Sequence, residues 1–126
     1  MSYQFHLEKF EGPLDLLLNL IEKEKLDITQ VSLAQVADQY LGYIRDEEHL
    51  SLENLSAFLT IAARLILIKS RALLPILTFS DEEEEAMEDL EYHLKAYRLF
   101  REAAQGLGTY FRTRKSAHHR ESFLGT

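Results

Sequence analysis

The chain has 126 residues, with 14 basic and 21 acidic side chains and a formal charge of −7. A chain of this length forms one domain with at most an appendage. The lack of cysteine in the sequence excludes a disulfide scaffold, a thiolate metal site and a cysteine nucleophile, and the acidic balance argues against a dedicated nucleic-acid-binding protein.

The composition predicts an all-α protein. The sequence holds 23 leucines but only 2 valines, and leucine favours helices whereas valine favours strands. Residues 3–11 alternate loosely between apolar and polar side chains, so we expect a short extended lead-in. Gly12 and Pro13 then start a predicted helix from Pro13 to Lys25, because proline is well suited to a first helical position.

The first two predicted helices each carry an apolar face. Leu16 and Leu20 lie off the main face of the first helix, so its apolar surface is wider than one core contact needs. Ser32 and Gln35 form a capping-box pattern that predicts the start of the second helix. Its apolar positions fit one buried stripe: Leu33, Val36, Ala37, Tyr40, Leu41 and Ile44.

A third helix is predicted from about Leu52 to Leu73, with Ser51 as its cap. Between Ala57 and Ile68 only Thr60 and Arg64 are polar, so the helix is apolar over most of its circumference. Two interpretations stay open: it is the central core helix of the bundle, or one apolar flank awaits a helix from a partner protein.

A fourth helix is predicted to begin after Pro75, where Ser80 and Glu83 form a second capping box. We expect it to end near Ala104, with Gly106 as the stop, and the region beyond to be a loosely ordered tail. The helix has two apolar stripes and follows an acidic run, which favours an arm outside the three-helix bundle. The stripes are Met87, Leu90, Leu94, Tyr97 and Ala104, and Tyr92, Ala96, Leu99, Phe100 and Ala103.

The sequence offers no candidate for catalysis, a metal or a cofactor. It contains no P-loop, dinucleotide fingerprint or nucleophile elbow. The five histidines are scattered, and none has the spacing of a metal-binding pair. We therefore expect a protein that is not an enzyme. The sequence also shows no signal peptide and no run long enough to span a bilayer, so a cytoplasmic location without membrane contact is the expectation.

Two blocks of this sequence resemble the ScpA family of segregation and condensation proteins, the bacterial kleisins. The first block runs from Phe10 to Ile21 (FEGPLDLLLNLI) and the second from Ala62 to Pro75 (AARLILIKSRALLP). The resemblance implies a non-catalytic subunit that bridges the heads of the SMC ATPase, recruits a ScpB dimer, and acts in chromosome condensation and segregation. DNA is then contacted only indirectly through the complex, at the nucleoid, and no small-molecule substrate is implied. The family's C-terminal winged helix is missing, so we expect this chain to be part of a longer protein.

The resemblance also implies a division of the chain by partner. Residues 1–78 are expected to form the domain that binds the SMC coiled-coil neck, residues 79–108 an arm that binds ScpB, and residues 109–126 the start of a central region. The expected SMC-neck residues are Leu55, Leu59, Ala62, Ala63, Ile66, Lys69 and Ser70. The expected ScpB residues are Leu90, Tyr92, Leu94, Tyr97 and Phe100.

An alternative of a different class stays open at this point. The chain's end carries the cations Arg112, Arg114 and Lys115 beside two aromatic residues, and such side chains can bind phosphate and stack on bases. The chain would then be a helical DNA-binding or regulatory domain.

Overall fold

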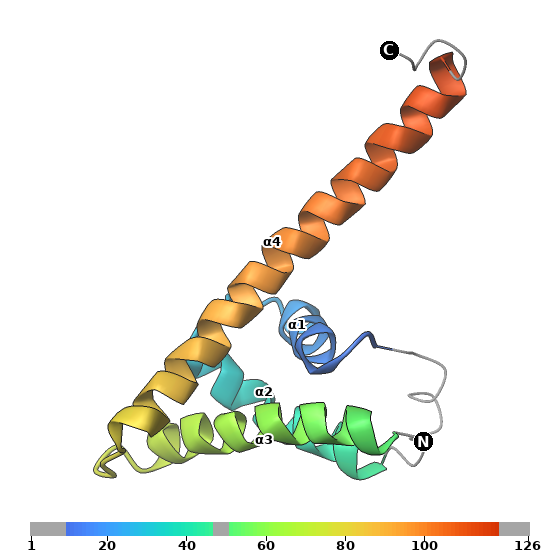
Figure 1. Cartoon of the computed structure of the whole chain (residues 1–126). Helices are drawn as coiled ribbons and strands as arrows, with labels where there is room; N and C mark the ends of the chain where they lie inside the picture. Colours follow the sequence, from blue (N-terminus) through green and yellow to red (C-terminus); the bar gives the residue numbers. More distant parts are fainter. Residues whose placement is uncertain (1–9, 47–50, 119–126) are drawn as a thin grey trace. The chain divides into compact units, whose positions relative to one another are not determined.

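The computed structural model of the protein describes residues 10–46 and 51–118, with side chains up to Arg114. The described part holds four α-helices and no strand, which confirms the all-α prediction. Residues 3–9 of the predicted lead-in (3–11) and the last residues of the predicted tail, 119–126, lie outside the described part. The helices in Figure 1 are α1 (Pro13–Lys23), α2 (Gln30–Asp46), α3 (Leu52–Leu73) and α4 (Asp81–His118).

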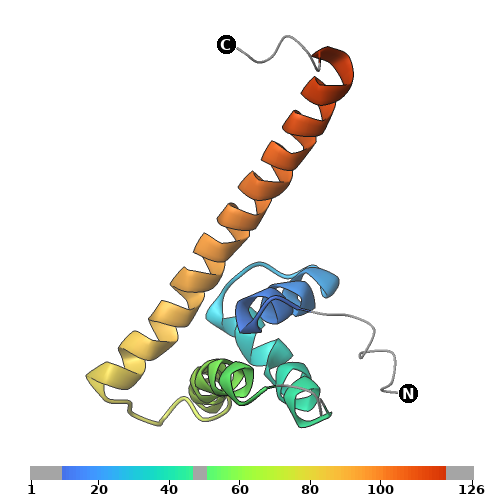
Figure 2. The ribbon, with the colours of Figure 1, turned by 45° about the vertical axis from the view of Figure 1, so that its right-hand side comes forward.

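The chain divides into two compact units, Met1–Lys95 and Ala96–Thr126. The boundary falls inside α4, so the first turns of this helix belong to the unit that contains α1, α2 and α3. In that unit α2 contacts both α1 and α3. Figure 2 shows α3 nearly end-on beside α2.

The first unit has one apolar core to which all four helices contribute. The α3 stripe in this core consists of Phe58, Ala62, Leu65 and Ile68. In α4 the buried positions are Met87, Leu90 and Leu94, which recur at helical spacing on one side of the helix. The other core side chains are Leu16, Leu17, Leu18 and Ile21 from α1, and Leu33, Val36, Ala37 and Tyr40 from α2.

Tyr40 joins α2 to α3. Its side chain is fully buried and its hydroxyl donates a hydrogen bond of 2.8 Å to the carbonyl oxygen of Phe58. The two rings stack with centroids 6.2 Å apart. Burial raises the pKa of the Tyr40 phenol well above its ordinary value, because the phenolate would lose its hydration.

Arg71 ties the end of α3 to its neighbours in the first unit. One guanidinium nitrogen lies 2.6 Å from the Glu84 carboxylate and another lies 2.5 Å from the Gln30 side-chain oxygen. The guanidinium also lies 5.7 Å from the centre of the Phe79 ring. One side chain therefore links α2, the α3–α4 connection and the first turn of α4.

The helix starts follow local capping rules, with one correction. Ser51 accepts the Asn54 N–H, and Ser80 and Glu83 form the predicted reciprocal capping box. The predicted cap at Ser32 is wrong, because α2 begins earlier at Gln30. Thr29 is the cap: its hydroxyl accepts the Ser32 N–H at 3.1 Å.

The predicted end of the fourth helix is also wrong. We expected Gly106 to stop it, but α4 continues through Gly106 and Gly108 to His118. A glycine ends a helix when the backbone turns into the left-handed region, and inside a helix it costs only about 1 kcal/mol relative to alanine. The neighbouring Leu107, Tyr110 and Phe111 keep helical spacing, so the apolar pattern extends past the glycines.

Candidate functional site

The exposed side of α3 carries a seam of large apolar and small side chains. Four large side chains recur every seven residues: Leu52 is 83% exposed, Leu59 50%, Ile66 50% and Leu73 66%. Between them lie the small residues Ser56, Ala63 and Ser70, which also recur every seven residues. We call these seven residues the α3 seam.

The spacing of the α3 seam is that of a coiled coil. Steps of four and three residues alternate along it, which places the seam at the a and d positions of a heptad repeat. The large residues occupy one heptad position and the small residues the other, so a second helix can approach closely over the small side chains. Because the seam keeps a seven-residue period over the whole helix, it suits a left-handed supercoiled partner.

The structure places four of the seven expected SMC-neck residues on the α3 seam: Leu59, Ala63, Ile66 and Ser70. The other three, Leu55, Ala62 and Lys69, recur along one flank of the seam, towards the core. Ala62 is buried, and the Lys69 ammonium lies 2.5 Å from the Asp38 carboxylate of α2. The expected set lacked Leu52, Ser56 and Leu73, although their seven-residue spacing is visible in the sequence.

The expected ScpB residues do not share one face of α4. Leu90 and Leu94 are fully buried in the core of the first unit. Tyr97 is half-buried, whereas Tyr92 and Phe100 are 68% and 69% exposed. Of the five, Tyr92 and Phe100 are the large side chains that α4 presents to solvent.

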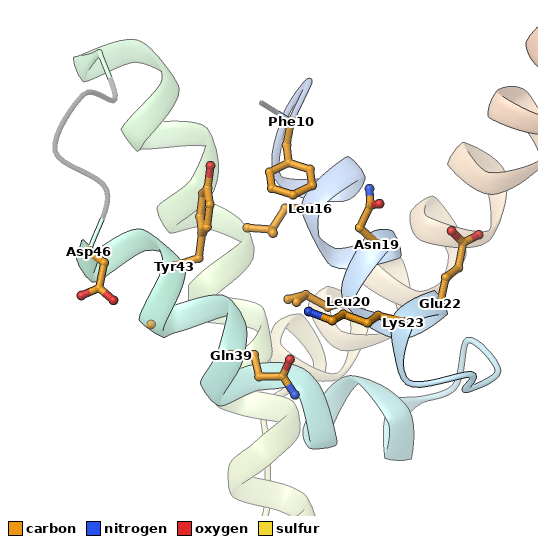
Figure 3. A pocket seen from close by; sticks show the side chains of 10 residues that line it. Phe10, Leu16, Asn19, Leu20, Glu22, Lys23, Gln39, Tyr43 and Asp46 are labelled. Atoms are coloured by element: carbon orange, nitrogen blue, oxygen red, sulfur yellow. The ribbon is translucent and has the colours of Figure 1, made fainter. Parts of the chain in front are cut away.

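A groove of about 600 Å³ lies between α1 and α2 (Figure 3). Its apolar wall comes from Phe10, Leu16, Leu20 and Tyr43. Phe10 packs edge-on against Tyr43, with ring centroids 5.5 Å apart. Leu16 and Leu20 are the α1 residues that the sequence placed off the main apolar face. The groove's polar lining comes from Asn19, Glu22, Lys23, Gln39 and Asp46.

No three histidine or acidic side chains among residues 10–46 and 51–118 gather closely enough to hold a metal ion. Within the same ranges, no helix combines the length and the apolar character needed to cross a membrane. Most of the large exposed apolar side chains of this part of the chain lie on α3 and α4.

Comparison with known sequences finds the family that the two signature blocks resemble. The family described as "Segregation and condensation protein ScpA" matches residues 20–124. The segregation and condensation protein A of Halalkalibacterium halodurans is 41% identical, over 94% of this chain and 48% of its own length. The protein of that name in Bacillus licheniformis is 43% identical over 85% of this chain and 45% of its own length.

A third relative, from Streptococcus uberis, bears the same name and is 45% identical over 81% of this chain and 44% of its own length. The chain thus spans less than half the length of each of these three relatives. The match nevertheless covers most of the chain at a consistent level of identity. The chain belongs to the ScpA family of segregation and condensation proteins.

Proposed function

We propose that this chain is the N-terminal and central part of a non-catalytic kleisin subunit. In this proposal it binds the coiled-coil neck of an SMC protein through α3 and recruits a ScpB dimer through α4. The longer protein bridges two SMC heads and acts at the nucleoid, in the cytoplasm, in chromosome condensation and segregation. Membership of the ScpA family supports the role in segregation. The spacing of the α3 seam supports a coiled coil as the partner.

The single observation that carries the neck assignment is the seven-residue period of the α3 seam. Exposed leucine and isoleucine side chains along one helix face are costly in water, and a coiled coil offers the complementary ridge of side chains. The flank residue Lys69 is 31% exposed and can reach acidic residues of such a partner while it stays close to Asp38.

The ScpB assignment rests on a different surface. Tyr92 and Phe100 are exposed on α4, and aromatic side chains are frequent anchors of protein interfaces. Leu90 and Leu94 are buried inside the first unit, so their role in this proposal is to hold α4 in place.

The test of the neck assignment is a pair of double variants. Ala63→Glu with Ile66→Glu places two charges in the middle of the α3 seam. We expect the affinity for an SMC head-and-neck fragment, followed by co-elution, to fall at least tenfold, because both carboxylates would be desolvated in the interface. The matched control, Asn54→Glu with Ala57→Glu, adds the same charges at exposed positions off the seam and should bind as the unaltered chain does.

Circular dichroism of both variants checks that the helices persist. Undiminished binding by a folded seam variant would contradict the α3 assignment, and equal loss in the control would show that added charge alone weakens the complex. Tyr92→Ala with Phe100→Ala tests the ScpB assignment in the same way, with purified ScpB as the partner.

A further inference from the structure

A second set of apolar side chains lies along α4, apart from the buried Met87, Leu90 and Leu94. Its six large side chains are between 51% and 69% exposed: Tyr92, Leu99, Phe100, Leu107, Tyr110 and Phe111. The small residues Ala96 and Ala103 lie among them and are also exposed. We call these eight residues the repeat face. The face spans about 28 Å of helix at 1.5 Å per residue.

The repeat face has a period of its own. Tyr92, Ala96 and Phe100 are followed exactly 11 residues later by Ala103, Leu107 and Phe111. An 11-residue repeat corresponds to 3.67 residues per turn, close to that of a straight α-helix, so two such helices pack with only slight supercoiling. This geometry differs from the left-handed supercoil that the α3 seam suits.

Charge is distributed very unevenly along α4. Eight carboxylates lie between Asp81 and Glu91, whereas Arg112 and Arg114 lie close to its end. The guanidinium of Arg114 lies 5.5 Å from the Tyr110 ring centre, which places it beside the repeat face. Two parallel copies would place acidic turns beside acidic turns. Two antiparallel copies would place the acidic turns of each beside the basic turns of the other.

We propose that the repeat face binds a second copy of this chain in antiparallel orientation. One register satisfies both the size and the charge of the side chains. In it Phe100 faces Ala103 of the second copy, Ala96 faces Leu107, and Tyr92 faces Phe111. Large residues thus meet small ones at the centre of the pair. The same register brings Asp89 opposite Arg114 at each end. Tyr92 and Phe100 also belong to the proposed ScpB contact, so a second copy and ScpB would exclude each other on this face, and the pair is therefore tested without ScpB.

The absence of cysteine from the sequence makes the register directly testable. Two single variants of the 126-residue chain are prepared, Ala96→Cys and Leu107→Cys. In the proposed pair, residue 96 of one copy lies opposite residue 107 of the other. Two copies of residue 96 are then about 16 Å apart along the helix axis, too far for a disulfide, which needs Cα atoms within about 7 Å.

We expect mild oxidation to give a disulfide-linked dimer from the mixture of the two variants and almost none from either variant alone, as read on a non-reducing gel. Strong cross-linking of Ala96→Cys with itself would indicate a parallel pair and would overturn the proposal. A mass of one chain by light scattering at every concentration tested would also overturn the proposal. It would do so even if the chain binds added ScpB.

A charge exchange provides a second measurement that needs no cysteine. Arg114→Glu places a carboxylate opposite Asp89, and we expect the dimer dissociation constant to rise about fivefold or more. Asp89→Arg combined with Arg114→Glu in one chain should restore dimerisation. A single variant that dimerises like the unaltered chain, with helix content unchanged by circular dichroism, would contradict the proposed register.

Discussion

Tyr40 shows how one side chain can fix the orientation of two helices. The phenol is apolar enough to fill the core, and its hydroxyl finds an acceptor at the Phe58 carbonyl, 2.8 Å away. A buried hydroxyl without such a partner would destabilise the fold. Because Phe58 lies on the face of α3 that packs inward, this bond helps to set which face of α3 remains exposed.

We expect Tyr40→Phe to lower the free energy of unfolding by about 1 kcal/mol, since the ring packing is kept and one buried hydrogen bond is lost. Urea unfolding followed by circular dichroism measures the change. Thr78→Val, which removes an exposed hydroxyl in the α3–α4 connection, is the matched control and should leave the unfolding midpoint unchanged.

The effect of Tyr40 should also depend on pH. Burial raises the phenol pKa in the folded chain above its ordinary value of 10.0, so above pH 10 the unfolded chain loses this proton first. The contribution of Tyr40 is therefore fully present below pH 10 and is lost as the pH rises further. The stability difference between the unaltered chain and Tyr40→Phe should narrow above pH 10. A constant difference from pH 8 to 11 would contradict this account.

At the scale of elements, α3 and α4 each have two functional sides. The core side of α3 carries Phe58, Leu65 and Ile68, and its other side carries the α3 seam. On α4 the side chains of Met87, Leu90 and Leu94 are buried, whereas those of the repeat face are exposed. The period of each exposed face, seven residues on α3 and 11 on α4, indicates which helix geometry it can bind.

Arg71 holds the α3–α4 connection, and its loss should be measurable. We expect Arg71→Ala to lower the free energy of unfolding by about 1 kcal/mol, because two charge-assisted bonds are lost at a half-exposed site. Lys95→Ala, which removes an ion pair with Glu91 one turn away on the same helix, is the matched control and should cost about 0.3 kcal/mol. Urea unfolding of the two variants compares them, and equal costs would contradict a linking role for Arg71.

At the scale of the whole molecule, the charge of −7 is concentrated rather than spread. Eight carboxylates occupy the start of α4, and the cations Arg112 and Arg114 lie far along the same helix. Long-range repulsion from the acidic groups opposes binding of a polyanion by the isolated chain. In the proposed complex, contact with DNA is left to other subunits.

The isolated chain should therefore show no salt-sensitive affinity for duplex DNA in the micromolar range at roughly physiological ionic strength. Fluorescence anisotropy with a labelled duplex measures this. Binding that falls steeply with salt and disappears when Arg112, Arg114 and Lys115 are changed to glutamine would instead support a DNA-binding function.

The sequence alone determined the helical fold, most helix starts and the family. Leucine content, capping residues at Ser51 and Ser80, and the two signature blocks are local features, and each acts through its own few residues. Two of the local predictions were wrong. Thr29 caps the second helix in place of the later Ser32, and the apolar spacing carries the fourth helix past Gly106.

Only the tertiary structure decided which apolar side chains are buried. Nothing in the sequence separated Ala62 from Ala63 or Leu90 from Tyr92, since each pair was expected at the same interface. In the structure Ala62 and Leu90 lie in the core, whereas Ala63 and Tyr92 face solvent. Burial is decided by the neighbours that fold against a helix, and those neighbours are distant in the chain. The sequence could therefore show that α3 and α4 carry more apolar surface than a core needs, but the packed structure was required to show which side is left for a partner.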